Sequence, residues 1–324
     1  MNRILISRTD SIGDVVLTLP MCQALREQFP EARLIYIGKK YTESVVNCFD
    51  CIDEFWDVDA LLNQPIAMQI DQMKADCIIH VFPNKALASL AKRAKIPMRI
   101  GTSHRVFHLF TCNYRPNFTR KNSPYHESQL NFHLLAPLGI TTIPDLDDIS
   151  SNLKLNRPTE SIPLDFQWEK DTYVLLHPKS KGSALEWPIE KYMLLAEQLA
   201  NGGTKVCFTG TEEEGQLFRM KLPVHPNIMD STGKLSLTQL ISLIGNAKAL
   251  VACSTGPYHI AGVSGVNAIG LFSMRRPIDP GRWKAIGPKA QFLVFDEQCK
   301  ACKKGEKCRC IEDISVDSVM NAIG

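Results

Sequence analysis

The sequence predicts an α/β protein with two domains, each built on a mainly parallel sheet, and three observations carry this prediction. Short apolar runs alternate with stretches of helical periodicity along both halves of the chain. The length of 324 residues exceeds that of one average domain. A segment from Thr141 to Asp171, rich in Pro, Asp, Asn and Ser, separates the two alternating halves. We therefore expect domains at 1–165 and 166–324, with a boundary near Ser161–Asp171.

The first domain is expected to begin with a strand, Arg3–Ser7, then a polar loop, Arg8–Ile12, and a long helix, Gly13–Phe29. Strands and helices alternate after it, in this order: strand Leu34–Gly38, a helix through Val45 and Val46, extended Glu54–Val58, a helix around Leu61–Met73, strand Cys77–Phe82, helix Lys85–Ala94, strand Arg99–Gly101 and helix His126–Leu138.

The second domain repeats the alternation: strand Tyr173–His177, helix Pro188–Ala200, strand Lys205–Thr209, helix Glu213–Lys221, helix Ser236–Gly245, strand Ala249–Ala252, helix Pro257–Val263 and strand Asn267–Phe272. A final helix is expected over 315–323, and packing of this helix back on the first domain is one option. Open parallel sheets bind ligands at the carboxyl ends of their strands, so we expect the site in a cleft between two such edges.

Composition narrows the class of protein. A hydrophobic content of 44% and a charged content of 22% are typical of a soluble globular chain. No apolar stretch approaches the ~18 residues that a membrane span requires, and the first seven residues are too short for a signal peptide. We therefore expect a cytoplasmic protein. Most of the 11 cysteines lie singly in predicted strands and helices, where a thiol behaves as a small buried hydrophobe.

The charge is unevenly distributed although the net charge is only +3. No acidic residue lies between Asp76 and Glu127, whereas that span contains nine cations: Lys85, Lys92, Arg93, Lys95, Arg99, Arg105, Arg115, Arg120 and Lys121. Such a one-sided stretch favours an anionic partner, which could be a phosphorylated or carboxylated glycan, an acidic lipid surface or a nucleic acid. The alternative is that these charges scatter over several solvated faces.

A second stretch predicts an anion site. The apolar run Ala249–Ala252 is followed by Ser254, Thr255, Gly256 and Pro257, and a helix resumes after them. Ser254 or Thr255 can cap that helix, Gly256 permits close approach of a ligand to the backbone, and proline is tolerated in the first turn. Free N–H groups and the helix dipole then favour a phosphate. An ordinary strand-to-helix turn remains the alternative.

These residues also resemble a known family. The run RTDSIGDVVLTLP from Arg8 to Pro20 resembles the amino-terminal signature of glycosyltransferase family 9, the heptosyltransferases. The run STGPYHIA from Ser254 to Ala261 is similar to the second signature, usually written Asp-Thr-Gly-x-x-His. The tract Thr232–Leu237 and the late Cys-x-x-Cys followed by a further Cys also resemble the family.

The resemblance implies a GT-B fold, in which two Rossmann-like domains face each other across a cleft. It implies that the first domain holds the acceptor and that the second holds the nucleotide sugar. The implied activity is an inverting transfer of heptose, or a related sugar, from ADP-heptose to the inner core of lipopolysaccharide. No metal or other cofactor is implied, and the expected partners are the nucleotide sugar and an anionic lipid-linked glycan, with peripheral contact to the inner membrane surface and no nucleic acid.

The resemblance also suggests roles for individual residues. It places the catalytic base at Asp14, with Asp10 as the second candidate. Donor contacts are expected from the anion turn, a ribose-binding carboxylate and nearby lysines: Ser254, Thr255, Gly256, Pro257, His259, Glu212, Glu213, Lys179 and Lys181. Acceptor contacts are expected from the first loop and the basic stretch: Asp10, Gly13, Arg99, Arg105 and Arg120. For the glutamates, an acidic first helical turn is the structural alternative; for His259, it is a hydrogen bond to a backbone carbonyl.

Two departures from the family pattern bear on the donor. The family usually has Asp where this chain has Ser254, and Lys where it has Leu185, two residues before Trp187. Lys179 or Lys181 could supply the missing charge from a shifted position. A different nucleotide-sugar donor and a non-catalytic, nucleotide-binding relative therefore stay open. A nicotinamide oxidoreductase is disfavoured because no Gly-x-Gly-x-x-Gly follows the first strand.

Four cysteines cluster near the end of the chain, at Cys299, Cys302, Cys308 and Cys310. Four thiolates can bind zinc tetrahedrally, yet a Cys-x-Cys pair is tight for one ion, and the flanking lysines suit a mobile surface loop equally well. We therefore assign no metal ligand here, leave zinc binding by these thiols open, and expect no metal requirement for activity.

Overall fold

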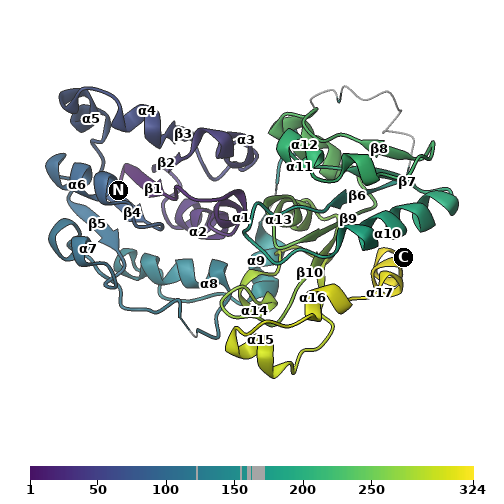
Figure 1. Ribbon diagram of the computed structural model, residues 1–324. Coiled ribbons are helices and arrows are strands. Elements are labelled where there is room, and N and C mark those ends of the chain that lie inside the picture. Colours follow the sequence, from purple (N-terminus) through teal and green to yellow (C-terminus); the bar gives the residue numbers. More distant parts are fainter. Residues whose placement is uncertain (122, 154, 159–161, 163–171) are drawn as a thin grey trace. The chain divides into compact units, whose positions relative to one another are not determined.

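The computed structural model describes residues 1–121, 123–153, 155–158, 162 and 172–324. The chain forms two compact units, Met1–Asn156 and Arg157–Gly324 (Figure 1). Most of the segment in which we expected the boundary, Ser161–Asp171, lies outside the described residues. Each unit contains an α/β arrangement of its own.

The first unit contains a five-stranded parallel sheet in the order β3-β2-β1-β4-β5. The strands are β1 (Arg3–Ser7), β2 (Arg33–Gly38), β3 (Glu54–Asp57), β4 (Cys77–His80) and β5 (Met98–Gly101). All five were predicted. Strands β1, β2 and β4 consist mainly of buried apolar residues in a continuous run, which is typical of buried parallel strands. The strand order reverses between β1 and β4, and ligands of such sheets bind beyond the carboxyl ends of the strands at this point.

The helices of this unit are more broken than predicted. The expected helix Gly13–Phe29 consists of α1 (Ile12–Val16) and α2 (Leu19–Gln28), because Pro20 at the start of α2 has no N–H to continue the helical ladder. The expected helix at Leu61–Met73 is divided in the same way, before Pro65, into α4 (Val58–Leu62) and α5 (Ile66–Gln72). The remaining helices of the first half of this unit are η1 (Lys40–Thr42), α3 (Glu43–Val46) and α6 (Lys85–Arg93).

Two helices of the first unit were missed. One is α7 (Val106–Thr111), inside the basic stretch, and the other is α9 (Leu146–Asn152), inside the segment that we expected to be a linker. Asp145 caps α9 by accepting a hydrogen bond from the backbone N–H of Asp148 at 2.8 Å. The predicted helix His126–Leu138 is helical only as α8 (Glu127–Phe132) and continues as the 3₁₀ helix η2 (His133–Leu138), which contains a proline.

The second unit contains a six-stranded parallel sheet in the order β11-β10-β9-β6-β7-β8. The strands are β6 (Tyr173–His177), β7 (Lys205–Phe208), β8 (Ile228–Asp230), β9 (Ala249–Cys253), β10 (Asn267–Leu271) and β11 (Ala290–Leu293). The edge strands β8 and β11 were not predicted, because each is short and only half-buried, so its apolar pattern is weak. The strand order reverses between β6 and β9, which predicts a ligand site there.

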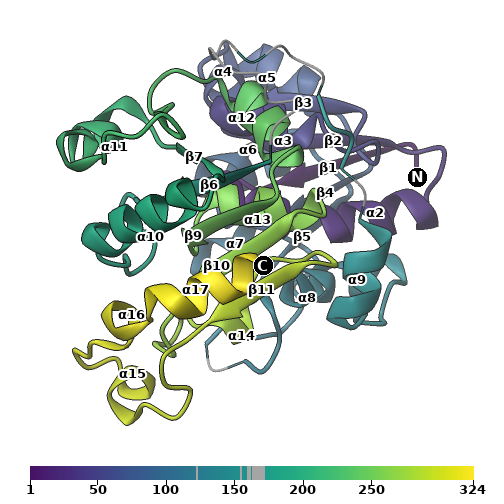
Figure 2. The same ribbon diagram turned by 90° about the vertical axis from the view of Figure 1, so that its right-hand side faces the viewer.

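The helices described in the second unit are α10 (Ile189–Asn201), α11 (Glu212–Gln216), η3 (Arg219–Lys221), α12 (Leu237–Gly245), α13 (Gly256–Val263), α14 (Pro280–Trp283), α15 (Lys300–Lys304), α16 (Cys310–Asp313) and α17 (Val316–Ile323). Among them, α10, α13 and α17 pack on strands of this sheet. The last helix, α17, packs on α10 and β10 (Figure 2). Its Val319 and Ile323 are buried in the core of this unit. This helix therefore belongs to the core of the second unit, and the option that it also packs on the first domain stays a prediction.

Candidate active site

A buried arginine organises the carboxyl edge of the first sheet. Arg8 directly follows β1, and only 3% of its side chain is exposed. Its guanidinium forms ion pairs with three carboxylates: Asp10 (Nε to Oδ1, 2.7 Å), Asp14, and Glu127 (Nη1 to Oε1, 3.3 Å). Because a guanidinium carries its donors in a rigid fork, it can hold several carboxylates in one geometry. Arg8 therefore fixes the two candidate bases side by side at the end of β1.

Asp10 and Asp14 keep partial access to solvent, with exposed side-chain fractions of 21% and 16%. Burial raises the pKa of Asp10 to about 6; the charge of Arg8 opposes this shift, and that of Asp14 adds to it. Tyr41 fixes the loop by donating its hydroxyl to the backbone carbonyl of Asp10 at 2.8 Å. The Ser11 hydroxyl donates to the carboxylate of Asp14 in the first turn of α1. A carboxylate with a pKa near 6 is suited to accept a proton around neutral pH.

Gly13 is buried in the first turn of α1, between these two carboxylates in sequence. Its proposed contact with an acceptor stays a prediction. The structure does bring Gly13, Asp10 and Asp14 to the carboxyl edge of the first sheet, as the motif indicated.

The three predicted acceptor arginines of the basic stretch have different surroundings. Arg99 is tied into the fold, since its guanidinium donates to the backbone carbonyl of Thr111 at 2.8 Å and to that of Ile96. Arg120 forms an ion pair with buried Glu127 and donates to Asn131 at 2.9 Å. Of the three predicted acceptor arginines, only Arg105 is exposed, at the start of α7. Other polar groups of the protein thus already bind Arg99 and Arg120, and acceptor binding by the three arginines stays a prediction.

The turn between β9 and α13 has the features of an anion site. Thr255 is the N-cap residue of α13, but its side chain makes no capping hydrogen bond, and Pro257 lies in the first turn. The Thr255 hydroxyl is buried and has no hydrogen-bond partner among the described residues. Ser254 and Gly256 remain partly exposed, so a ligand can approach the first N–H groups of the helix. This helix start is therefore open for an anion, whereas α11 and α12 begin with complete capping boxes.

The loop after β6 adds charge beside this turn, since β6 and β9 are neighbours in the sheet. Lys179 forms an ion pair with Glu186, which also accepts a hydrogen bond from the Ser180 backbone N–H at 2.8 Å. Lys181 is exposed and pairs with no carboxylate in the described part of the chain. Leu185 packs against the hydrophobic core, so the position at which the family has lysine is apolar and inward-facing here. Lys181 is therefore the better candidate for the missing cation.

The carboxylates after β7 divide into two kinds. Glu212 forms a bidentate pair with Arg219, both contacts being 2.8 Å, and these hydrogen bonds lower its pKa to about 2. Glu213 is exposed in the first turn of α11, and local hydrogen bonds lower its pKa. The carboxylate of Glu213 can thus accept hydrogen bonds from the hydroxyls of a ligand. Glu212 would first have to break its ion pair with Arg219.

His259 is buried in the second turn of α13, and the structure does not distinguish its two interpretations. His177 is a buried residue that the sequence analysis did not assign. It ends β6, its Nδ1 lies 3.0 Å from the Thr209 hydroxyl, and burial lowers its pKa while the charge of Glu214 opposes this shift. The position of His177 at the carboxyl end of a central strand could have identified it as a candidate site residue from the sequence. Arg8 and Glu127 were missed for a different reason, since 119 residues separate them in the chain.

Each of these sheets reverses its strand order where candidate residues gather: a carboxylate pair suited to deprotonating a hydroxyl in one, and an open helix start suited to a diphosphate in the other. These are the parts of a glycosyltransferase of the GT-B class. Solved structures have the same fold. An Escherichia coli ADP-heptose lipopolysaccharide heptosyltransferase II has a TM-score of 0.77 with 16% identity, covering 100% of this chain and 97% of its own. The E. coli heptosyltransferase WaaC with ADP has a TM-score of 0.74 with 16% identity, covering 99% and 98%.

The family described as glycosyltransferase family 9 (heptosyltransferase) matches residues 66–311, and the chain belongs to this family. The match includes the second signature, with Thr255 and Gly256. Among the curated relatives, lipopolysaccharide heptosyltransferase 3 of E. coli is 21% identical over 80% of this chain and 80% of its own length. None of the helices in the described part of the chain is both long and apolar enough to cross a membrane.

Proposed function

We propose that this glycosyltransferase transfers heptose from ADP-heptose to the inner core of lipopolysaccharide, with inversion at the anomeric carbon and without a metal in the reaction. The open start of α13 carries the proposal for the donor: uncapped N–H groups and the unpartnered Thr255 hydroxyl suit a diphosphate. The relatives named as heptosyltransferases, and the neighbour bound to ADP, support an adenosine diphosphate sugar as the donor and lipopolysaccharide as the acceptor.

The residues present account for each requirement of the reaction. A carboxylate of the Asp10–Asp14 pair removes the proton from the acceptor hydroxyl as that oxygen attacks the anomeric carbon. The bond to the diphosphate breaks in the same step, and the helix start at Gly256, together with Lys181, stabilises the charge on the leaving ADP. Because ADP can leave without a proton, one base is sufficient. Glu213 is suited to the hydroxyls of the donor ribose.

The donor is tested by incubating the protein with ADP-heptose, UDP-glucose and GDP-mannose in turn, with heptose-deficient lipopolysaccharide as acceptor, and analysing the product by mass spectrometry. We expect a mass increase of one heptose with ADP-heptose alone. Transfer of another sugar would assign a different donor, in keeping with the departures at Ser254 and Leu185. Binding of ADP without transfer from any donor would make the chain a non-catalytic relative.

The anion turn is tested with Gly256→Val. We expect this variant to bind ADP at least ~10-fold more weakly in calorimetry, because a branched side chain keeps the phosphates away from the backbone N–H groups. Gly202→Ala is the matched control, since Gly202 follows α10 and an added Cβ there would meet only ordinary contacts at 3.4 and 3.5 Å. Unchanged ADP affinity in a folded Gly256→Val protein would remove the donor site from this turn.

We also propose a cytoplasmic location with peripheral contact to the inner membrane surface through α7. Three apolar side chains of this short helix are exposed, Val106, Leu109 and Phe110, with exposed fractions of 75%, 51% and 69%. Exposed Arg105 directly precedes the helix. Apolar side chains that enter the lipid boundary, next to a cation that attracts anionic headgroups, are typical of interfacial helices.

Vesicle flotation tests this contact. We expect the wild type to float with vesicles of phosphatidylcholine and phosphatidylglycerol and to bind several-fold less at high salt, because salt screens the headgroup attraction. The double variant Leu109→Ser, Phe110→Ser should bind several-fold less at both salt concentrations. The control Met220→Ser, at a more exposed apolar site on η3, should bind as the wild type does. Equal flotation of all three proteins would show that α7 is not the contact.

A further inference from the structure

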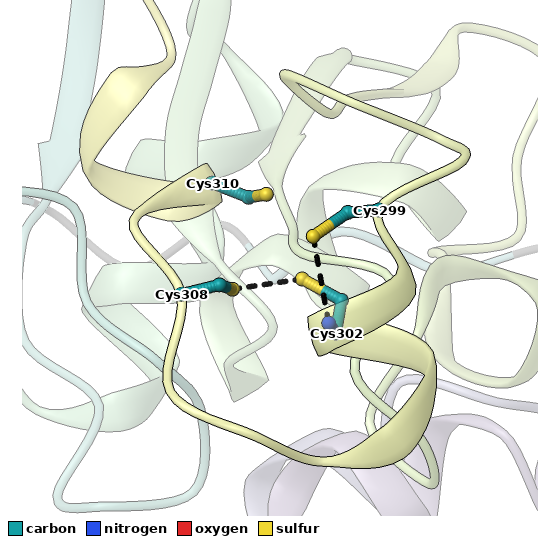
Figure 3. A group of neighbouring side chains, drawn as sticks. All are labelled: Cys299, Cys302, Cys308 and Cys310. Atoms are coloured by element: carbon teal, nitrogen blue, oxygen red, sulfur yellow. Dashed lines mark hydrogen bonds between the residues drawn. The ribbon is translucent and has the colours of Figure 1, made fainter.

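The cysteine cluster near the end of the chain is gathered more tightly than its spacing suggested. The Sγ atoms of all four cysteines lie within 4.8 Å of one another, and their side chains point toward a common centre (Figure 3). In a tetrahedral zinc site with Zn–S distances near 2.3 Å, the sulfurs are about 3.8 Å apart. The four thiols therefore need only small movements to surround one ion.

Local structure explains how the two pairs meet. Cys299 caps α15, accepting the backbone N–H of Cys302 at 3.5 Å, so these two thiols lie on the first turn of one helix. Gly305 ends α15 at a φ of +76°, a left-handed conformation that favours glycine and reverses the chain. The reversal brings Cys308 back, with its Sγ 2.9 Å from that of Cys302, and Cys310 then begins α16.

We propose that Cys299, Cys302, Cys308 and Cys310 form a structural tetrathiolate metal site, which holds a single zinc or iron ion. None of the candidate catalytic residues belongs to the cluster. Binding of Zn²⁺ displaces the four thiol protons to solvent and leaves a site with a formal charge of about −2. The exposed cations in the same segment compensate for that charge: Lys300, Lys303, Lys304, Lys307 and Arg309.

Packing indicates what the ion would stabilise. The helices α15 and α16 have five and four residues, too short to be stable alone, and the segment from 297 to 309 supplies few apolar side chains. Immediately after Cys310, the side chains of Ile311 and Ile314 enter the core of the second unit. The Trp187 indole donates to the Ile314 carbonyl at 3.0 Å. The ion thus fixes the segment that leads from β11 to α17 and that supports Trp187, next to the Lys179–Glu186 loop.

The first test measures metal content. The full chain is purified without chelators from cells supplied with both metals, and zinc and iron are determined by mass spectrometry of the elements. We expect about one metal ion per chain in the wild type and in Cys48→Ser, the control at a buried thiol of the first unit. Cys299→Ser and Cys308→Ser, at the two partly exposed ligands, should each retain less than about a fifth of it. The element found identifies the ion.

The second test examines structure rather than activity. Removing the ion with a chelator under reducing conditions should lower the Tm by roughly 5 °C, and adding the metal back should restore it. Cobalt added to the metal-free protein should give the intense visible absorption of tetrahedral thiolate coordination. Wild-type protein with less than about a tenth of an ion per chain and four reactive thiols would overturn the proposal. So would an intact mass reduced by the hydrogens of one or two disulfides, which the approach of Cys302 and Cys308 also permits.

Discussion

Replacing Asp14 with asparagine is expected to lower kcat for glycosyl transfer by roughly 10²–10⁴-fold, the usual share of a positioned general base. Asparagine has nearly the same shape and retains one oxygen, which can accept a hydrogen bond from Arg8 or from Ser11, both of which donate to Asp14. ADP affinity should therefore remain within about twofold, because the proposed donor residues belong to the second unit. Single-turnover kinetics and ADP calorimetry measure the two quantities.

Asp10→Asn is the matched comparison, since Asp10 pairs with the same guanidinium. If Asp14 is the base, this variant should lose less turnover than Asp14→Asn. A larger loss in Asp10→Asn would transfer the role to Asp10, and near wild-type turnover in both variants would remove general-base catalysis from this loop.

The pH profile provides a second readout of the same prediction. The base must be ionised, so kcat/KM should fall as the pH drops through the titration of the Asp10–Asp14 pair, in which burial raises the pKa of Asp10 to about 6. Because the two carboxylates interact, the observed value belongs to the pair. In Asp10→Asn the remaining carboxylate loses a like-charged neighbour, so its pKa should decrease and the acid limb should move to lower pH. An unshifted limb would show that the pair does not control the reaction.

The strands were easier to predict than the helices, and the difference is physical. Central strands such as β1 and β6 are buried on both faces, so the sequence of each is a nearly continuous apolar run with clear ends. Helix ends depend on single residues, and Pro20 and Pro65 divided two predicted helices. The edge strands β8 and β11 gave no comparable signal, because an edge strand needs little apolar surface.

The motifs located both candidate sites, but they did not predict which ion-pair partners each site residue has in the folded protein. The order of the signatures correctly brought Asp10 and Asp14 to one sheet edge and Thr255 and Gly256 to another. The pairing of Arg120 with Glu127, and of Glu212 with Arg219, depends on side-chain geometry that spacing does not encode. Sequence spacing was likewise insufficient for the cysteines. The spacing of the Cys-x-Cys pair suggested that it could not share one ion with the other two thiols, yet all four thiols converge because Gly305 reverses the chain.

Replacing Arg8 with leucine is expected to destabilise the first unit by ~3–5 kcal/mol near pH 7, because three carboxylates then lose a buried counter-charge. Arg120 still neutralises part of the charge on Glu127. The expected loss of unfolding free energy is therefore smaller than the sum of the energies of three separate ion pairs. Hydrogen exchange of the β1 and β2 amides reports the opening free energy of this unit. Arg33→Leu is the control, since its pair with Glu54 is largely exposed and should be worth no more than ~1 kcal/mol.

The pH dependence distinguishes lost charge from lost packing. In Arg8→Leu the desolvated carboxylates have no counter-charge, so their folded-state pKa values rise above the unfolded ones, and protonation stabilises this variant as the pH falls through them. The stability difference from the wild type should therefore be largest near neutral pH and narrow toward about pH 4. Arg8→Lys keeps the charge but loses the fork, and we expect it to recover part of the stability while leaving transfer impaired, because Asp10 and Asp14 are no longer held in one geometry. A difference that stays constant with pH would mean that Arg8 acts through packing alone.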